Sequence, residues 1–296
     1  MTEVAVLTPD PSDLSYASQW PGVLERLSEA LASAGITACP TPWTDHVDSP
    51  DGLKPYPLVL PVIAWGYHRD HGRWLDACAA WQAAGLPLAN PARVLGWNSD
   101  KTYLARLAER GVTIPPTLFV DQVTPEAIEA AFARFSVATL IVKPTISAGA
   151  WKTLKIEAGD DLSAAVAQAP AGPAMIQPFV PTIATEGETS LLFFGGRFSH
   201  AVNKRPGTEG EFRIQVQFGG QYRALNTVPE AVMALALRTL EAIDEPLLYA
   251  RIDMVPDLAG QWCLMEAELI EPDFYLAAAP DAGPRFARAV AERLRA

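Results

Sequence analysis

The chain has 296 residues, of which 49% are hydrophobic and 19% are charged, and its formal net charge is −11. This composition is typical of a soluble globular protein with a large core, and the length favours two or three subdomains. The acidic balance argues against a general surface for nucleic acid or an anionic membrane, so we expect a small-molecule partner, no nucleic acid and no membrane.

The N-terminal sequence and the cysteines indicate a cytoplasmic protein. The first residues, MTEVAV, run directly into a strand-like segment without the basic region of a signal peptide. No apolar stretch reaches membrane-spanning length. Cys39, Cys78 and Cys263 are far apart and form no CxxC spacing, which argues against a disulfide framework or a zinc site. We therefore predict reduced cysteines and a cytoplasmic location.

Residues 1–92 alternate between strand and helix patterns, as in a parallel α/β unit. Helices are predicted at 21–35, which begins with a proline and stops at a glycine, and at 73–84. The strands predicted in this region cover residues 4–7, 36–40, 58–64 and 86–89. Because the sequence has no GxGxxG, a dinucleotide-binding fold is not supported.

An aromatic and basic segment, AWGYHRDHGRW, follows the predicted strand at 58–64. Loops at the carboxyl ends of parallel strands line the ligand crevice of such sheets. Trp65, Tyr67, His68 and Arg69 are therefore candidates for a substrate pocket. A surface loop with two aromatic side chains tucked beneath it accounts for the same residues equally well.

Two lysines occur where an anion would stabilise them. A linker at 90–101 is predicted to lead into a helix capped by Asn98 or Ser99, with Lys101 in its first turn. A cation there opposes the helix dipole, so Lys101 is a candidate for binding an anion, and an ordinary surface lysine accounts for it equally well.

Lys143 closes the apolar strand TLIVK and precedes the small-residue segment PTISAGAWKT, which includes Ser147. An ammonium group beside backbone N–H groups that oxygens can approach is typical of phosphate sites, although the GxxxxGK[ST] pattern is missing. The strand itself follows a strand at 117–120 and a helix opened by Thr124.

The segment AMIQPFVPT and the loop NKRPGTEGEFR extend this pattern. Gln177 and the backbone of Phe179 and Val180 are candidates for contact with a purine. A hairpin at 189–194 and 197–202 then leads into the loop at 203–213. This loop carries the cationic group suited to a polyphosphate or a developing oxyanion, unless it is a solvated basic loop; its members are Lys204, Arg205 and Arg213. Helices are predicted from Pro229 and from about Pro284.

An acidic hairpin at 247–272 is the strongest functional signal in the chain. Asp253 lies in the first strand, and Glu266 and Glu268 share one face of the second. Three carboxylates among apolar side chains repel one another and lose hydration unless a hard cation with oxygen ligands neutralises them. We therefore predict a Mg²⁺ site that holds two ions, against the alternative of a hairpin with a wet acidic face.

Together these segments resemble the ATP-grasp superfamily, in the glutathione-synthetase-like and ribosomal-protein glutamate-ligase-like branch. The resemblance covers about residues 90–272 and is strongest at RIDMV and MEAELIEP. It implies an α/β chain with a Rossmann-like N-terminal domain, followed by two α+β subdomains that clamp ATP. The corresponding ranges are 1–92, 93–180 and 181–296, the last with the metal site.

The same resemblance implies the roles of individual residues. Asp253, Glu266 and Glu268 match the ligands of two Mg²⁺ ions, for which Mn²⁺ is an expected substitute. Residues that match the ATP-binding positions are Lys101 and Lys143 at the phosphates, Ser147 in the small-residue loop, Gln177, Phe179 and Val180 at the adenine, and Glu188 near the ribose. Arg213 matches an arginine that stabilises the transferred phosphate, and Lys204 and Arg205 are grouped with it as catalytic candidates.

The upstream stretches WGYH, LANP and WNSDKTYL also resemble a smaller group that includes the O-ureido-serine cyclo-ligase of D-cycloserine formation. That group has W-D-Y-H where this chain has Gly66, so the substrate is left open.

The resemblance implies an ADP-forming, Mg²⁺-dependent carbon–nitrogen ligase for a small amino-acid-like substrate. It would activate a carboxylate or carbonyl oxygen as an acyl-phosphate-type intermediate for attack by an amine. The alternatives are a cyclo-ligase of the O-ureido-serine type, a non-catalytic nucleotide-binding module, and a plain α/β module whose acids bind Ca²⁺ or nothing. A homodimer is common in this superfamily and is one possible assembly here, but the residues leave the oligomeric state open.

Overall fold

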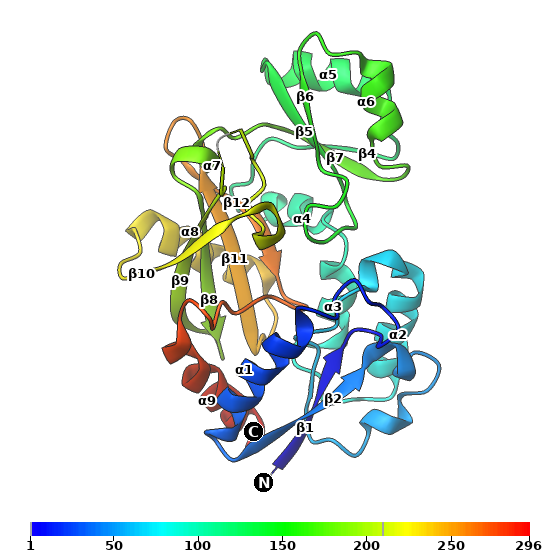
Figure 1. Cartoon of the computed structure of the whole chain (residues 1–296), viewed down its shortest axis with the longest axis vertical. Coiled ribbons are helices and arrows are strands. Elements are labelled where there is room, and N and C mark those ends of the chain that lie inside the picture. The colour runs from blue at the N-terminus through cyan, green and yellow to red at the C-terminus, as the bar shows by residue number, and fades with distance from the viewer. Residues whose placement is uncertain (1, 209) are drawn as a thin grey trace.

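The computed structural model describes residues 2–208 and 210–296, so Glu209 of the predicted basic loop lies outside the described residues. The strands form three sheets, each built from one stretch of the chain. Figure 1 shows the first sheet at one end of the long axis, the second at the other, and the third between them. Across the described ranges, no helix is both long and apolar enough to cross a bilayer.

The first sheet is parallel, with the order β2-β1-β3. Its strands and helices are β1 (Thr2–Thr8), α1 (Trp20–Ala32), β2 (Ile36–Pro42), β3 (Val59–Leu60) and α2 (His71–Ala83). The strand predicted at 58–64 is much shorter, because Pro61 has no N–H for the ladder and accepts a turn bond from Ala64. The strand predicted at 86–89 is reduced to a bridge between Leu88 and Val59.

The prediction of a linker at 90–101 is wrong. Residues Ala92–Asn98 form helix α3, which Pro91 precedes, and its Val94 and Leu95 are buried. Helix α4 spans Tyr103–Glu109, so Lys101 lies in the turn before the helix and not in its first turn. The sequence predicts a loop here because Asn-Pro and Trp-Asn-Ser, which are typical of loops, stand on either side of the apolar residues of α3.

The second sheet is antiparallel, with the order β4-β7-β5-β6. Its strands are β4 (Leu118–Val120), β5 (Thr139–Pro144), β6 (Leu154–Glu157) and β7 (Ala174–Pro178), and helices α5 (Pro125–Phe135) and α6 (Leu162–Gln168) cover it. The side chain of Thr124 caps α5, as predicted. Leu140 and Val142 enter the core, and Ile141 and Lys143 alternate onto the opposite face.

The third sheet is antiparallel, with the order β10-β9-β8-β11-β12. Its strands are β8 (Glu188–Phe194), β9 (Arg197–Arg205), β10 (Gln221–Leu225), β11 (Tyr249–Pro256) and β12 (Trp262–Glu268), with helices α7 (Thr182–Thr185), α8 (Glu230–Ile243) and α9 (Gly283–Arg293). The hairpins β8–β9 and β11–β12 confirm the two predicted hairpins. Strand β10 was not predicted, because this edge strand pairs with β9 alone and is half exposed.

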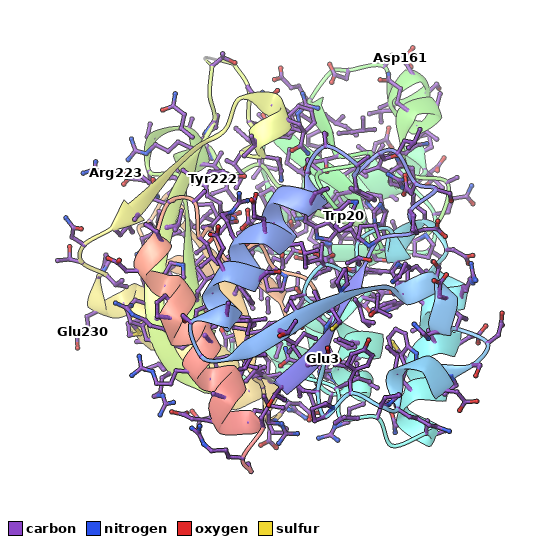
Figure 2. All side chains as sticks on the ribbon, turned by 60° about the horizontal axis from the view of Figure 1, so that its bottom comes forward. Glu3, Trp20, Asp161, Tyr222, Arg223 and Glu230 are labelled. Carbon is purple, nitrogen blue, oxygen red and sulfur yellow. The ribbon has the colours of Figure 1, made fainter. Side chains whose placement is uncertain are left out.

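Helix α9 packs against α1, which joins the first and third sheets through one core. Figure 2 shows the two helices side by side, and Leu27 and Leu31 share a cluster with Phe286 and Val290. Each sheet lies inside one of the predicted ranges 1–92, 93–180 and 181–296. The shared core, however, joins residues of the first range to residues of the third. The division into three domains stays a prediction.

Side chains replace a further strand along the free edge of β12. The amide of Asn98 donates to the Ala267 carbonyl and accepts from the Leu269 N–H at 2.8 and 2.9 Å. The Tyr103 hydroxyl donates to the carbonyl of Ala267 and accepts from its N–H. Because an unpaired strand edge leaves polar groups unsatisfied, these bonds fix the strand that carries Glu266.

We expect Asn98→Ala to lower the free energy of unfolding by about 1–3 kcal/mol, because the buried N–H of Leu269 loses its partner. Urea denaturation measures this loss. The matched control is Asn226→Ala, since Asn226 is exposed, and its effect should stay within about 0.5 kcal/mol. Equal effects of the two substitutions would show that the edge bonds do not stabilise β12.

Candidate functional site

The acidic hairpin brings its three carboxylates together, as predicted. Asp253 pairs with Glu266 across the strands, and Arg251 pairs with Glu268. Oxygen atoms of Asp253, Glu266 and Glu268 all lie within 4.8 Å of one another. A register shift after Asp253 accommodates one additional residue in β12. This geometry places three hard oxygen ligands where one divalent cation could contact them.

The chain itself supplies cations to these acids, which the sequence did not predict. Arg251 and Lys204 both bind Asp253, each with a 3.1 Å contact to Oδ2, and the hydroxyl of Ser190 donates to Oδ1 at 2.6 Å. Arg251 also forms an ion pair with Glu268. The carboxylates therefore do not depend on a metal ion alone for neutralisation.

Two further ion pairs extend this network, one buried and one partly buried. Lys204 binds Glu188 as well as Asp253, and the Lys101 ammonium lies 3.0 Å from Glu266. The acids of this network outnumber its lysines and arginine by one, since Glu188, Asp253, Glu266 and Glu268 face Lys101, Lys204 and Arg251. An added cation would remove that remaining negative charge.

The charges of the network shift the pKa values of its acids in opposite directions. Burial opposes the charged form of Asp253, but Arg251 and Lys204 outweigh it and lower the pKa to about 2. Burial raises the pKa of Glu268 well above its usual range, and the neighbouring acids add to this effect against Arg251. Glu268 is thus the carboxylate whose charge a bound cation would favour most.

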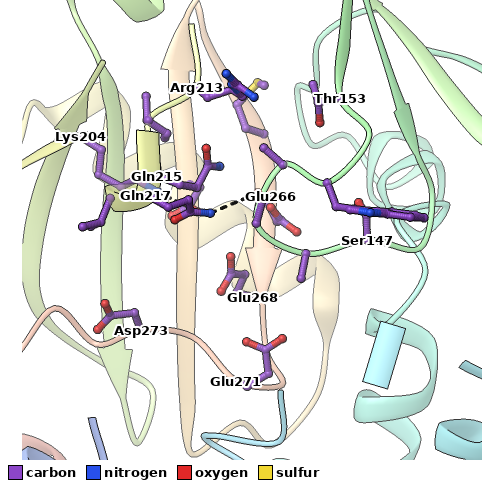
Figure 3. A pocket seen from close by; sticks show the side chains of 18 of the residues that line it. Ser147, Thr153, Lys204, Arg213, Gln215, Gln217, Glu266, Glu268, Glu271 and Asp273 are labelled. Carbon is purple, nitrogen blue, oxygen red and sulfur yellow. Dashed lines mark hydrogen bonds and ion pairs between the residues drawn. The ribbon is translucent and has the colours of Figure 1, made fainter. Parts of the chain in front are cut away.

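The acids line a cavity of about 1330 Å³ that receives side chains from the second and third sheets and from segments that follow β1 and β3. Figure 3 shows Glu266, Glu268 and Glu271 along one wall, with Ser147 on the opposite side. Arg213 and Thr153 lie at one end of this view, and Glu271 and Asp273 lie at the other. Its volume exceeds the range typical of a pocket for one small ligand.

The two predicted phosphate lysines face this cavity. Lys101 donates to the carbonyl of Ser147 at 2.9 Å, and its own N–H donates to Thr145, so it holds the small-residue loop in place. Lys143 also lines the cavity, and burial lowers the pKa of its ammonium. Among the residues that the structure describes, Lys143 has no ion pair.

The predicted purine contact needs one correction. The N–H of Phe179 donates to the Thr139 carbonyl at 3.0 Å and continues the sheet, so it cannot bind a ligand. The amide nitrogen of Gln177 donates to Thr117 at 2.9 Å. The Phe179 carbonyl and the Val180 N–H are the backbone groups that remain for a purine edge.

The predicted basic loop separates into three different environments. Lys204 belongs to β9, where only 3% of its surface is exposed, and not to a loop. Arg205 is exposed, donates to Asn203 and does not appear among the described residues that line the cavity. Arg213 lines the cavity and forms a two-point ion pair with Glu211.

Glu188 is likewise occupied, because its carboxylate binds Lys204 inside the network. Burial raises its pKa despite this ion pair. A contact with a ribose would therefore need Glu188 to share its oxygens with Lys204. Its role near a nucleotide stays a prediction.

The aromatic and basic segment also lines the cavity. Trp65, Tyr67, His68 and Arg69 all contribute to its wall. Tyr67 is buried and packs on Trp74, with 4.9 Å between ring centroids. Burial and the charges of Arg69 and Lys101 lower the pKa of His68 to about 4, so this imidazole is neutral near pH 7. A neutral ring can accept a hydrogen bond from a ligand.

The sequence analysis does not identify four residues that line the cavity, which are Arg251, Glu271, Asp273 and Gln217. Arg251 and Glu271 stand in the quoted motifs RIDMV and MEAELIEP, so their positions beside Asp253 and Glu268 were the available signal. Gln217 had no such signal, because its contact is made across the cavity. Its side chain donates to the Gly149 carbonyl at 3.3 Å, so it links the small-residue loop to the segment that carries Gln217 (Figure 3).

Comparisons with known proteins agree with this geometry. Residues 4–90 match the family model described as the N-terminal domain of D-cycloserine synthetase DcsG. The cycloserine biosynthesis protein DcsG of Streptomyces lavendulae is 30% identical over 282 residues, which cover 91% of this chain and 93% of that protein.

Solved structures show the same likeness. The crystal structure of D-cycloserine synthetase DcsG is 27% identical, with a TM-score of 0.82 and 99% of each chain covered. D-alanine–D-alanine ligase from Bacillus anthracis is 16% identical, with a TM-score of 0.73 over 99% of this chain and 97% of that one. The second likeness concerns the fold alone.

We expect Lys204→Met to lower the free energy of unfolding by about 3–5 kcal/mol at pH 7, because it leaves Asp253 and Glu188 buried without their shared ammonium. Urea denaturation measures the change. Lys54→Met is the control, since Lys54 forms an exposed pair with Asp51.

The loss should also depend on pH. Without Lys204 the folded-state pKa values of Asp253 and Glu188 rise. Protonation of these acids then stabilises the folded variant at low pH, and this stabilisation is lost as pH rises. The difference between variant and native protein should therefore be smaller at pH 5 than at pH 8. A difference that is constant with pH would contradict this account of the network.

Proposed function

Because this chain belongs to the family of the cycloserine biosynthesis protein DcsG, and is an ATP-grasp ligase, we propose that it uses Mg²⁺ and ATP to activate a carboxylate of a small amino-acid-like substrate. An amine would then displace the phosphate. The observation that supports this most directly is the cluster of Asp253, Glu266 and Glu268 in one cavity with Lys101 and Lys143. Acids for a metal ion and lysines for phosphates face one another there.

The first step would transfer the γ-phosphoryl group of ATP to the substrate carboxylate. A carboxylate oxygen bonds to the γ-phosphorus while the bond from that phosphorus to the β-phosphate oxygen breaks, and ADP leaves. Lys143, which has no ion pair among the described residues, would hold phosphate oxygens. Arg251 lies beside Asp253 and Glu268, closer to the acids than Arg213, and would offset charge on the moving group.

The second step would form the carbon–nitrogen bond. The amine nitrogen bonds to the activated carbonyl carbon, the bond to the phosphate oxygen breaks, and the nitrogen loses a proton. Water would hydrolyse the same intermediate. The contact from Gln217 to Gly149 already joins the loops over the cavity, and a closed loop pair would exclude that water.

The residues present fit a Mg²⁺ ion. Asp253, Glu266 and Glu268 supply oxygen ligands only, and they would hold one or two ions, with Mn²⁺ as a substitute. When bound, the metal supplies neutralisation of phosphate oxygens. Lys204 and Arg251 keep Asp253 charged and oriented for this role. The predicted homodimer and cytoplasmic location stay predictions.

A cyclo-ligase acting on a substrate of the O-ureido-serine type is the specific form that we favour. The matched N-terminal model spans residues 4–90, and these include Trp65–Arg69, which line the cavity beside the acid cluster. In such a reaction the carboxylate and the attacking nitrogen belong to one molecule. An ADP-release screen of amino acids and ureido-amino acids, with mass analysis for ring closure or condensation, separates the two forms. No ADP release with any of them would favour the non-catalytic module.

We expect Glu266→Gln to reduce Mg²⁺-dependent ADP release roughly 100-fold or more, because a metal ligand loses its charge. Thermal unfolding should change little, since the side chain is 31% exposed and its ion pair with Lys101 is only partly buried. Asp253→Asn is a weaker test, because it also disrupts the buried contacts with Arg251 and Lys204.

Glu157→Gln is the matched control, because Glu157 pairs with Lys155 on an exposed strand away from the acid cluster. It should leave ADP release unchanged. Native-like turnover by Glu266→Gln, measured with saturating Mg²⁺, would remove the assignment of this residue to the metal.

A further inference from the structure

One acid of the cavity is left unused by the metal site and the ion-pair network. Glu271 follows β12 and lines the cavity beyond Glu268 (Figure 3). Within residues 2–208 and 210–296 it forms no ion pair, whereas Asp253, Glu266 and Glu268 all do. The neighbouring Asp273 differs, because its carboxylate accepts from the N–H of Tyr275.

Glu271 shares its cavity with an aromatic wall, because Tyr16, Trp65 and Tyr67 line the same cavity. Burial raises the pKa values of the Tyr67 and Tyr16 hydroxyls, and the negative charge of Glu271 adds to both shifts. Tyr16 lies against Trp65 with 5.6 Å between ring centroids, and both rings line the cavity. A carboxylate opposite aromatic faces is a combination that binds ammonium groups through charge and through the ring quadrupoles.

Arg69 holds this wall in position. Its guanidinium binds Asp13 at 2.7 Å and Ser15 at 3.1 Å, and it lies 4.8 Å from the centre of the Tyr16 ring. The segment 10–19 is thereby fastened across Trp65–Arg69. The loop has no regular helix or strand of its own, so these contacts determine where Tyr16 lies.

Gly66 fits the same arrangement. It has a φ of +95°, and a side chain there would meet Tyr16 at 3.6 Å and Asp13 at 3.7 Å. These distances are ordinary van der Waals contacts, so position 66 favours glycine because of its left-handed backbone conformation.

We propose that Glu271 binds the ammonium group of the substrate against the Tyr16–Trp65 wall, and that Arg69 is the positioning residue for this wall. The inference rests on the proposed function and deepens it, because it names the residues that recognise the free ammonium group of the small carboxylate substrate. Glu271 lies at the opposite end of the cavity view from Arg213 and Thr153, so the ammonium group binds away from the nucleotide end (Figure 3).

The test compares an amino acid with its analogue that lacks the amine. O-Ureidoserine and 3-(ureidooxy)propanoate form such a pair. If native protein uses neither, the pair is replaced by the amino acid that gives the fastest ADP release in the screen and by the deamino analogue of that amino acid. Native protein should prefer the amine-bearing compound in kcat/KM. Glu271→Gln should raise KM for the amine-bearing compound roughly 10- to 100-fold and abolish the preference, while KM for ATP is unchanged.

The conservative variant Glu271→Asp keeps the charge and should retain part of the preference. Full preference in Glu271→Gln would overturn the inference, and so would a loss of kcat at unchanged KM. Failure of the proposed function gives a different result, because native protein then releases no ADP with any compound. The melting temperature of each variant with and without Mg-ATP checks that the nucleotide site is intact.

Arg69→Ala should raise KM for the amino acid at least several-fold without changing KM for ATP, because Tyr16 is released. Arg73→Ala is the matched control, since Arg73 is exposed nearby, donates to the Thr44 carbonyl and lies outside the cavity wall given by the described residues. Equal changes in both KM values of Arg69→Ala, or none, would contradict a positioning role.

Discussion

The burial of charge around Asp253 is the constraint on which the site depends. Removing one partner from a buried ion pair leaves an uncompensated charge, so each member of such a network fixes the position of the others. Arg251 and Lys204 come from two different strands and meet at Asp253, and Lys204 extends the network to Glu188. The interior of the third sheet therefore sets the orientation of the carboxylates before any ligand arrives, which is the preorganisation that phosphate chemistry requires.

The same strands are held from outside by the N-terminal half of the chain. Asn98 and Tyr103 bond to the free edge of β12, and the buried side chain of Asn90 donates to Tyr249 and Leu269 and accepts from Leu248. Lys101 lies between these residues and contacts both Glu266 and the small-residue loop. The segment 90–101, predicted as a linker, is thus the part of the chain that connects the strand carrying Glu266 to the small-residue loop.

The sequence predicted most of what periodicity and single motifs encode. The β11–β12 hairpin, the meeting of its three acids and the lysine at the end of β5 all follow from local patterns. Contacts between distant segments left no local signal. Lys204 looked like a mobile basic residue because its partners, Glu188 and Asp253, lie 16 and 49 positions away, and Phe179 looked available because its bond to Thr139 forms only in the folded sheet.

The cavity divides its chemistry by the origin of its walls. The second and third sheets supply lysines and acids suited to a metal-bound polyphosphate. The first sheet supplies the segment 10–19 and Trp65–Arg69, whose shape depends on Gly66 and Arg69. Because the two parts meet at Glu271, a change in the first sheet can alter the substrate while the nucleotide chemistry is kept. Selectivity is then expected to vary through the residues around Tyr16, and activity through those around Asp253.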